Sequence, residues 1–411
     1  MLVFIFNDRI LANTGWGIYS GPHNKMYEKK MNNLFVVFMS VATFVAALNI
    51  NASAVGQTGY LGSNACKPCH EDVYETWKTS KHSGIFKPEQ DSSSNCVACH
   101  STGTDLLKQS FTENVVGCES CHGPGEGHAS TGDPEKIVSI NSADICGRCH
   151  SRYQSGEDMT AMAEYKPGMK LSEIKGLKLI HVSSGKLPPS GKDVHPSMTY
   201  NMWLASGHAE TPARNIEINN KKWIGPVTCV ACHNPHGSDN SSQLIMKRDK
   251  ICNECHFQVD VQKGYGAKGI EETRNLHTPT PCFTCHMTEK NHLMKVFRPD
   301  DPDLSDNRMD SCTHCHRVGS REMRAKQIQD MEEWYNEAME PVQRDLKYIE
   351  EKLKNNPGIL NMELKSKLED VKSNLSIILN DGSNGVHNLD YALEIMTLAK
   401  RHLKEIKNAV Q

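Results

Sequence analysis

One five-residue pattern, Cys-x-x-Cys-His, recurs eight times in this chain of 411 residues and uses all 16 of its cysteines. We number these motifs 1 to 8 in chain order: Cys66, Cys69 and His70; Cys96, Cys99 and His100; Cys118, Cys121 and His122; Cys146, Cys149 and His150; Cys229, Cys232 and His233; Cys252, Cys255 and His256; Cys282, Cys285 and His286; Cys312, Cys315 and His316. No cysteine is left over for a disulfide or a nucleophile. Any fold of this chain must satisfy the same local chemistry eight times.

Covalent haem attachment explains every element of the motif. Two cysteines at this spacing form thioether bonds to the two vinyl groups of one porphyrin, and the adjacent histidine is then placed to bind the iron. Zinc is the alternative, because two Cys-x-x-Cys pairs can build a tetrahedral thiolate site. Neither zinc nor a disulfide explains why a histidine follows the second cysteine in all eight motifs. The pattern therefore predicts eight covalently attached haem c groups, with the motif histidines as proximal iron ligands.

The number of residues available for each haem constrains the fold. Residues 55–411, which follow the N-terminal apolar run, number 357 (411 − 54), or about 45 for each haem. So little polypeptide cannot build a conventional apolar core around every cofactor. We therefore expect a mainly α multihaem cytochrome c fold, in which short helices and loops wrap stacked haems that themselves form the core.

The N-terminus predicts export. An apolar run from Leu34 to Ile50 follows Lys29 and Lys30 and precedes the small residues Ala52-Ser53-Ala54. This is the layout of a signal peptide, and the run is shorter than the ~20 residues that a membrane-spanning helix needs. We expect residues 1–54 to be a signal peptide cleaved after Ala54, with a retained anchor as the alternative. Residues 1–30 look like an over-extended start, and Met26 or Met31 is a more natural initiator than Met1. The location expected is the periplasm or an equivalent compartment outside the cytoplasm.

The net charge argues against a nucleic-acid partner. It is −3 for the whole chain, and −5 (42 basic against 47 acidic residues) once residues 1–54 are removed. Neither value suggests nucleic acid. Because each haem adds two propionates, a basic redox partner fits the haem-loaded protein better.

The remaining chain divides into two predicted domains. Residues 55–319 hold the eight motifs and are expected to form the octahaem cytochrome c domain. The stretch 151–228 between motifs 4 and 5 is rich in Gly, Pro, Ser and Lys and includes Gly185–Gly191, a loop by composition. Residues 320–411 are expected to form a helical domain, because apolar residues recur there at three- and four-residue steps. Asn355-Asn356-Pro357-Gly358 ends its first helix, which contains Pro341. A second helix runs from about Leu360 to Leu379, where Asn380-Asp381-Gly382-Ser383 breaks it, and a third contains Leu389 to Ile406. This domain would serve as a packing bundle or an oligomer interface.

The histidine count decides whether any iron is open to a substrate. Of 20 histidines, eight are proximal ligands and eleven of the others lie after residue 54. A haem with histidine on both faces only passes electrons, whereas one with a vacant face can bind a small molecule. Seven histidines have settings that favour distal ligation of iron: His82, His128, His208, His236, His277, His292 and His387. His181, His195, His314 and His402 remain.

Several motifs and their flanks resemble the multihaem family that contains hydroxylamine oxidoreductase, its tetrahaem electron acceptor and pentahaem nitrite reductase. The segments are Cys66-Lys-Pro-Cys-His70 through Trp77 to His82, Gly117-Cys118-Glu-Ser-Cys-His122-Gly-Pro-Gly, Val227-Thr-Cys229-Val-Ala-Cys-His233-Asn-Pro-His-Gly and Cys282-Phe-Thr-Cys-His286-Met. Eight haems and a helical C-terminus look most like the octahaem, hydroxylamine-oxidoreductase-like branch. The resemblance spans nearly all of the chain after residue 54. The lysine-ligated motif of nitrite reductase and the widely spaced cysteines of octahaem sulfite reductase are absent from the sequence.

The resemblance implies seven haems with two histidine ligands and one five-coordinate catalytic haem at motif 4. Asp193 and His195 would lie over its iron and relay protons, although both also read as loop residues without a role. The oxidase carries a tyrosine cross-link to its catalytic haem. Tyr335, Tyr348 and Tyr391 are available for this link, with Tyr335 as our candidate, and the first two also fit helix packing.

Two functions follow. The first is an oxidoreductase that acts on hydroxylamine or a related small nitrogen compound at one open haem, while the other haems carry the electrons. The second is an electron-transfer protein in which every haem is six-coordinate. Either one needs a redox partner protein, namely another cytochrome or a quinol-linked membrane complex. The resemblance also implies a homo-oligomer, specifically a trimer.

Overall fold

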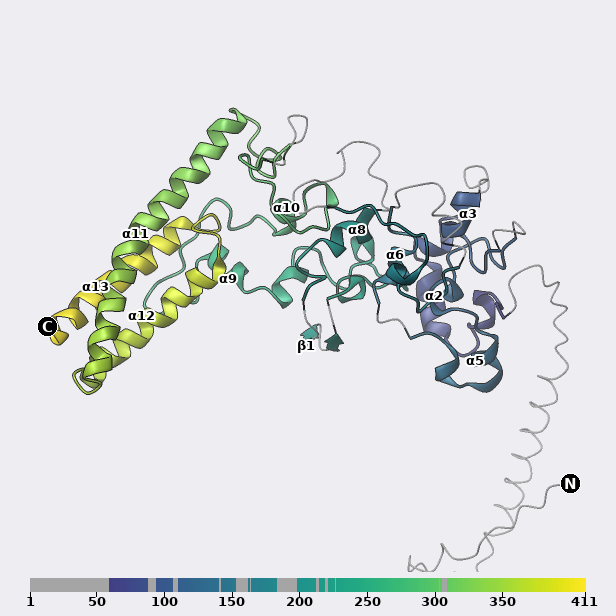
Figure 1. The fold of residues 1–411 in the computed structure, drawn as a ribbon, viewed down its shortest axis with the longest axis horizontal. Coiled ribbons are helices and arrows are strands. Elements are labelled where there is room, and N and C mark those ends of the chain that lie inside the picture. Colours follow the sequence, from purple (N-terminus) through teal and green to yellow (C-terminus); the bar gives the residue numbers. More distant parts are fainter. Residues whose placement is uncertain are drawn as a thin grey trace, which may run out of the picture. The chain divides into compact units, whose positions relative to one another are not determined.

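The computed structural model of the chain comprises two units, Met1–Ala54 and Val55–Gln411, of which part of the second is described here (Figure 1). The described residues are 59–87, 94–105, 110–139, 142–152, 162, 164–182, 198–211, 214–218, 221–225, 227–302, 304 and 309–411. All eight motifs fall within them. The predicted signal peptide and its cleavage lie outside them and stay predictions.

Short helices carry the motifs, as the small number of residues per haem predicts. The α-helices here are α2 (Glu71–Lys78), α3 (Ser94–His100), α4 (Cys118–His122), α5 (Glu126–Thr131), α6 (Asp144–Gly147), α8 (Thr199–Leu204), α9 (Gln258–Lys263) and α10 (Phe283–His286). Single 3₁₀ turns stand between them at Ser63–Ala65, His82–Gly84, Pro134–Lys136, Leu171–Glu173, Cys229–Ala231, Ser241–Gln243, Ile251–Glu254 and Thr288–Lys290. The mainly α multihaem fold is thus confirmed.

One antiparallel hairpin interrupts this pattern. Strands β1 (Arg214–Ile218) and β2 (Lys221–Gly225) pair in the register that places Ile216 opposite Trp223. The hairpin and α8 both fall in the stretch 151–228, for which sequence analysis predicted no helix or strand. The sequence does contain the cause, because residues 215–218, Asn-Ile-Glu-Ile, alternate between polar and apolar at the period of a strand.

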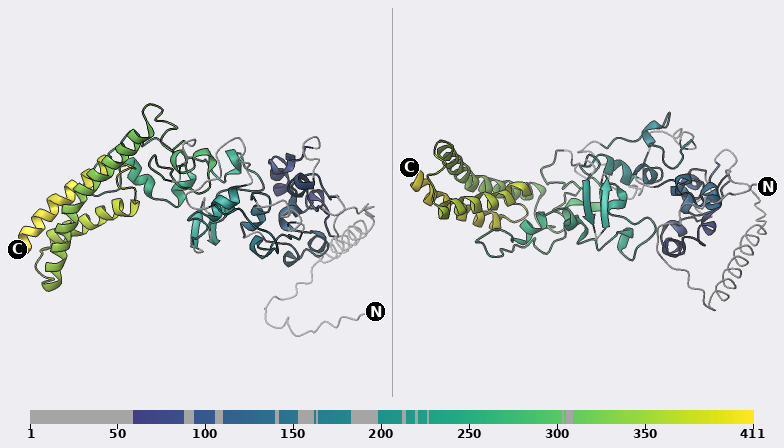
Figure 2. Two further views of the ribbon diagram at one scale, coloured as in Figure 1. Left: turned by 45° about the horizontal axis from the view of Figure 1, so that its top comes forward. Right: turned by 90° about the horizontal axis from the view of Figure 1, so that it is seen from below.

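Three long helices follow motif 8. They are α11 (Arg321–Asn355), α12 (Met362–Asp381) and α13 (Leu389–Val410), and Figures 1 and 2 show them packed alongside one another in green and yellow. Each begins at a side chain that accepts a hydrogen bond from a backbone N–H in the first turn: Ser320, Asn361 and Asn388. The C-terminal bundle predicted from apolar periodicity is confirmed, with α11 continuing through Pro341 and ending at Asn355.

The largest apolar core lies among these three helices. Ile349, Ile395, Leu403 and Ile406 are completely buried there. Burying a side chain of this size contributes about 1.5–3 kcal/mol, so the bundle supplies its own stability. The cluster extends past the bundle to Val261 of α9.

Hydrogen bonds join the bundle to the motif region. The Tyr391 hydroxyl accepts from the backbone N–H of Ala267 at 2.8 Å, and the Asn388 amide donates to Thr273 O at 2.6 Å. The Asn374 side chain bonds both the N–H and the C=O of Lys268, at 2.8 and 2.9 Å. The segment 264–274, between motifs 6 and 7, is therefore fixed to α12 and α13. No helix among the described residues is long and apolar enough to cross a membrane.

Candidate functional site

Each motif folds as one helical turn, which gathers its three chemical groups on one side. The backbone N–H of the histidine donates to the carbonyl of the first cysteine at 2.9–3.0 Å in motifs 1, 4, 5, 6, 7 and 8. Motifs 2 and 3 lie within α3 and α4. Residues i, i+3 and i+4 share one face of such a turn, so both sulfurs and the imidazole face the same direction. All 16 cysteines are free of disulfides.

Seven histidine rings lie opposite motif histidines, and they are the seven that the sequence marked as distal candidates. The pairs are His70 with His128, His122 with His236, His150 with His82, His233 with His292, His256 with His208, His286 with His387 and His316 with His277. The remaining motif histidine, His100, is not free, since it also makes an interaction with another residue.

The geometry of these pairs fits two ligands of one metal better than direct ring stacking. The separation of ring centroids is almost constant, from 5.9 to 6.3 Å, while the angle between ring planes ranges from 7° to 87°. Two imidazoles on opposite sides of a metal, each with a bond of about 2.0 Å, have centroids about 6 Å apart whatever their rotation about the shared axis. Direct aromatic contacts have no such fixed separation. The residues therefore fit the haem iron that the motifs imply.

Hydrogen bonds hold the rings in the tautomer that a metal ligand needs. The Nδ1 atoms of His122, His233 and His286 lie 2.9, 2.8 and 3.2 Å from the backbone carbonyls of Val138, Ser242 and Met294. Among the facing rings, those of His82, His128 and His292 contact the carbonyls of Pro235, Asp133 and Lys290 through Nδ1 at 3.3, 2.9 and 2.9 Å. A carbonyl only accepts, so Nδ1 donates and the Nε2 lone pair is available for a metal.

His387 differs from these rings in its partner. Its Nδ1 lies 2.7 Å from a carboxylate oxygen of Asp381, the last residue of α12. The Asp381 side chain is only 3 % exposed. Sequence analysis missed this residue, because Asn380-Asp381-Gly382-Ser383 was interpreted only as a helix break.

A second histidine lies opposite the motif at which the resemblance implies a five-coordinate haem. His82 follows α2 and faces His150 of motif 4, with ring centroids 6.3 Å apart. Asp193 and His195, expected over this iron, lie outside the described residues.

Tyr335, the candidate for the cross-link, is 4 % exposed and lies in the core of the bundle. Its hydroxyl lies 3.5 Å from the carbonyl of Ile378, and burial raises its pKa, with a smaller contribution from Asp381. None of its described contacts is with motif 4. Tyr348 packs against the same core, and Tyr391 is completely buried in it.

Sulfurs of different motifs lie close together. The neighbouring thiols that shift each other's pKa identify the pairs. Four thiol pairs share hydrogen bonds that raise the pKa of the first member and lower that of the second: Cys66 with Cys118, Cys99 with Cys149, Cys146 with Cys229 and Cys252 with Cys282. Other pairs are close enough to interact electrostatically, among them Cys121 with Cys149, Cys232 with Cys255 and Cys285 with Cys315. Once thioethers form, these sulfurs carry no proton, so the shifts serve only to show proximity.

These contacts order the motifs in space. Motifs 1, 3, 4, 5, 6, 7 and 8 follow one another as neighbours, and motif 2 joins at motif 4. Of the three exposed cysteines, Cys69 and Cys315 belong to the end motifs 1 and 8, and Cys255 belongs to motif 6. Groups attached at these sulfurs are therefore brought into a continuous row with one branch.

Two side-chain contacts that sequence analysis missed brace the motifs. Glu119, inside motif 3, is 1 % exposed and accepts hydrogen bonds from the backbone N–H groups of Leu61, Gly62 and Gly125 at 2.7–3.0 Å. It thereby fixes the segment before motif 1 and the segment after motif 3 to motif 3 itself. Asp310 is also 1 % exposed and pairs with Arg324 of α11 at 3.0 Å. Sequence analysis could not identify these carboxylates, because some of their hydrogen-bond donors come from other parts of the chain.

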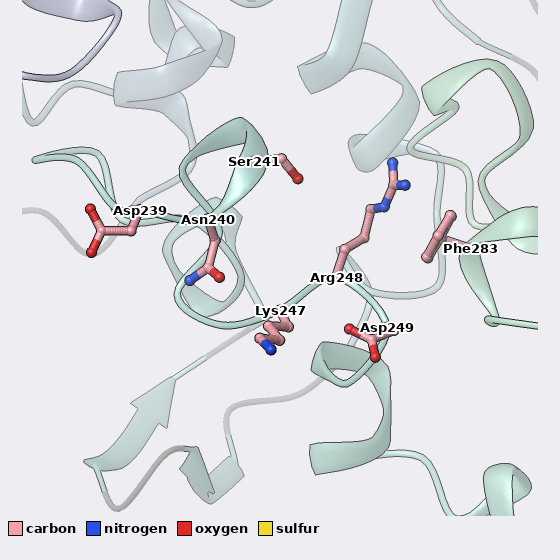
Figure 3. Close-up of a pocket in the computed structure, with 7 residues that line it drawn as sticks. All are labelled: Asp239, Asn240, Ser241, Lys247, Arg248, Asp249 and Phe283. Atoms are coloured by element: carbon pink, nitrogen blue, oxygen red, sulfur yellow. The ribbon is translucent and has the colours of Figure 1, made fainter.

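Two cavities lie among the described residues, and one of them includes Tyr335 in its lining. One of about 350 Å³ is lined by Lys247, Arg248, Asp249 and Phe283 among others, and its Arg248 guanidinium lies 3.8 Å from the centre of the Phe283 ring (Figure 3). A second, of about 490 Å³, is lined by Tyr335, Met339 and Leu379 among others. Neither has a histidine or cysteine in its lining.

Two family models match parts of the chain that contain motifs. Residues 65–123 match "Cytochrome c554 and c-prime", and residues 225–260 match "Doubled CXXCH motif". Cytochrome c-554 of Nitrosomonas europaea is 25 % identical over 170 residues, which are 31 % of this chain and 72 % of that protein. The multihaem cytochrome MtrA of Shewanella baltica is 28 % identical over 333 residues, 70 % of this chain and 94 % of MtrA.

Among solved structures, the outer cell wall cytochrome OcwA superposes with a TM-score of 0.64 at 21 % identity, over 84 % of this chain and all of OcwA. This likeness concerns the fold. Together with the repeated motif and the paired imidazoles, these findings define an electron-transfer protein that attaches haem covalently. The chain is a multihaem c-type cytochrome.

Proposed function

We propose that the chain is an electron-transfer relay with eight haems, in which at least seven irons have histidine on both faces. Bound haem supplies one-electron transfer. The protein holds each iron between a motif histidine and the ring that faces it. The observation that carries the proposal is the constant ring separation of 5.9–6.3 Å in pairs whose plane angles vary from 7° to 87°.

The relay is favoured over the enzyme because of motif 4. Oxidation of hydroxylamine or a related nitrogen compound at this haem requires an iron with a vacant face. The His82 ring lies 6.3 Å from the His150 ring, centroid to centroid, as a second ligand of the same iron would, and its Nδ1 lies 3.3 Å from the carbonyl of Pro235. With both faces occupied, motif 4 serves as a junction between its neighbours.

The order of the motifs supports transfer over a long distance. Close sulfurs connect motif 1 to motif 8 without a gap, and the exposed Cys69 and Cys315 mark the two ends. We propose that redox partners, such as another cytochrome or a quinol-linked membrane complex, dock near these ends. The proposal includes export of the chain, which the signal-peptide layout of its N-terminus predicts. The similar fold of OcwA belongs to a protein described as an outer cell wall cytochrome.

Spectroscopy of the haem-loaded protein tests the proposal. We expect the mass to exceed that of the polypeptide by eight haems. The oxidised protein should show low-spin electron paramagnetic resonance signals for at least seven irons. Carbon monoxide should leave the reduced spectrum of haem 4 unchanged. Strong carbon monoxide binding by the wild-type protein at haem 4 would instead support the enzyme.

Replacing the facing ring identifies haem 4. In His82→Ala the iron of motif 4 loses its distal ligand, so one haem should become high-spin and bind carbon monoxide. The matched control is His181→Ala, since His181 is exposed and is in none of the seven pairs. A low-spin His82→Ala protein with no response to carbon monoxide would refute the ligation.

A further inference from the structure

The hydrogen bond from His387 to Asp381 sets one haem site apart from the others. Among the described rings whose Nδ1 contact is known, six have a backbone carbonyl as partner and only His387 has a carboxylate. The proximal ligand in the same site, His286, has the ordinary arrangement, with Met294 O at 3.2 Å. The asymmetry therefore comes entirely from the distal side.

The carboxylate is built into this position. Asp381 ends α12, and its side chain also accepts hydrogen bonds from the hydroxyl and the backbone N–H of Ser383. Ser383 Oγ in turn accepts from the backbone N–H of His387 at 3.2 Å. The ring, the turn and the carboxylate thus hold one another, with Asp381 3 % exposed and His387 28 % exposed.

A buried anion on Nδ1 changes the ring as a ligand. It draws the Nδ1 proton and gives the imidazole anionic character, which makes Nε2 a stronger electron donor. A stronger donor stabilises ferric over ferrous iron, and hydrogen bonding around the axial ligand is one of the means by which proteins set haem potential. A neutral backbone carbonyl exerts this effect more weakly.

We propose that Asp381 is a positioning residue that holds His387 on the iron of motif 7 and lowers the reduction potential of that haem relative to its neighbours. The inference rests on the proposed ligation of haem 7 by His286 and His387. Because motif 7 lies between motifs 6 and 8 in the row, an electron on its way to haem 8 meets an uphill step there. The C-terminal bundle, through α12, thereby controls the last part of the relay.

Asp381→Asn tests the proposal, because it removes the charge and keeps the size and an acceptor oxygen. We expect one step of the potentiometric titration to shift upward and one low-spin signal to change its g-values, with the other haems unaffected. Asp390→Asn is the matched control: Asp390 is an exposed residue in the first turn of α13, three positions from His387. Equal shifts in both variants, or none in Asp381→Asn, would overturn the proposal. Conversion of one haem to high spin in Asp381→Asn alone would support it.

A further variant separates this inference from the proposed function. His387→Ala should make one haem high-spin and able to bind carbon monoxide. If every haem of His387→Ala stays low-spin, the ligation itself is wrong. If His387→Ala behaves as expected and Asp381→Asn changes nothing, only the role of Asp381 is wrong. Far-ultraviolet circular dichroism of each variant checks that the bundle remains folded.

Discussion

At the scale of single residues, buried carboxylates hold segments of the chain together through hydrogen bonds and ion pairs. Asp310 accepts from the backbone N–H groups of Cys312 and Thr313, each at 2.9 Å, and from the Thr313 hydroxyl at 2.7 Å. It also pairs with the buried guanidinium of Arg324, which donates in addition to the carbonyls of His316 and Gly319. This cluster fixes motif 8 to the start of α11.

Asp310→Asn is expected to lower the free energy of unfolding by about 3 kcal/mol at pH 7, because Arg324 loses its counter-charge in a buried site. Unfolding by denaturant, followed by the helical circular dichroism, measures the change. The control is Asp300→Asn, an exposed partner of Arg298, for which we expect less than about 0.5 kcal/mol. Equal effects of the two substitutions would show that burial does not matter here.

The pH dependence follows from the same contacts. Burial raises the pKa of Asp310, but hydrogen bonds from Thr313 and Arg324 outweigh it and hold the pKa below its usual range. A depressed folded-state pKa stabilises the protein above the unfolded-state value of about 3.9, and this contribution is lost as the pH falls through the folded-state pKa. The difference in stability between wild type and Asp310→Asn should therefore shrink below about pH 4.

The sequence marks candidate haem ligands residue by residue but does not show how they pair. The eight motifs are complete local signatures, and the seven distal candidates came from turn and loop settings near them. Pairing depends on long-range folding: His82 faces the histidine of motif 4, and His387 faces that of motif 7. Asp381 was missed for the same reason, since a short polar break in a helix does not show what its carboxylate touches.

At the scale of elements, the Asn234-Pro235-His236-Gly237 segment after motif 5 supports two distant motifs. The His236 ring faces motif 3, and Pro235 O accepts from the ring of His82, which faces motif 4. Gly237 has φ +123°, and a Cβ there would lie 2.7 Å from the carbonyl of Thr76 in α2. Both the backbone angle and the close approach require glycine.

Gly237→Ala is therefore expected to destabilise the protein by about 1–3 kcal/mol through backbone strain and to disturb two haems together. Low-spin signals of haems 3 and 4 should broaden or shift, as electron paramagnetic resonance would show. The matched control is Gly207→Ala, because Gly207 is also adjacent to a distal candidate, His208, but has nothing within 4 Å of its would-be Cβ. An undisturbed Gly237→Ala spectrum would mean that this segment does not position the two rings.

The long helices were predictable because each has a continuous apolar stripe and clear breaks. Asn355-Asn356-Pro357-Gly358 and Asn380-Asp381-Gly382-Ser383 separate α11, α12 and α13 as expected. The assignment of residues 320–411 to a separate domain stays a prediction, and Val55–Gln411 forms one compact unit in the structure. Contacts such as Ala267 N–H to the Tyr391 hydroxyl join residues too far apart in sequence for periodicity to reveal.

At the scale of the whole molecule, the order of the motifs predicts which haems are needed for electron transfer between motif 1 and motif 8. Among the sulfur contacts of the described residues, the path from motif 1 to motif 8 runs through motif 6, whereas motif 2 is connected only to motif 4. Removing the attachment cysteines of motif 6 should therefore interrupt transfer between the ends. Removing those of motif 2 should leave it largely intact.

Single-molecule conductance between anchors at the two ends measures this difference. Asp72→Cys, beside motif 1, and Arg317→Cys, beside motif 8, supply exposed thiols for gold contacts. On this background we expect Cys252→Ala with Cys255→Ala to lose most of the conductance, and Cys96→Ala with Cys99→Ala to retain most of it. Both variants lose two cysteines and one haem, so the second controls for general damage from a missing cofactor. If both variants lose the same share of the conductance, motif 6 is no more important to the path than the branch at motif 2. The haems would then not conduct in the order given by their sulfurs.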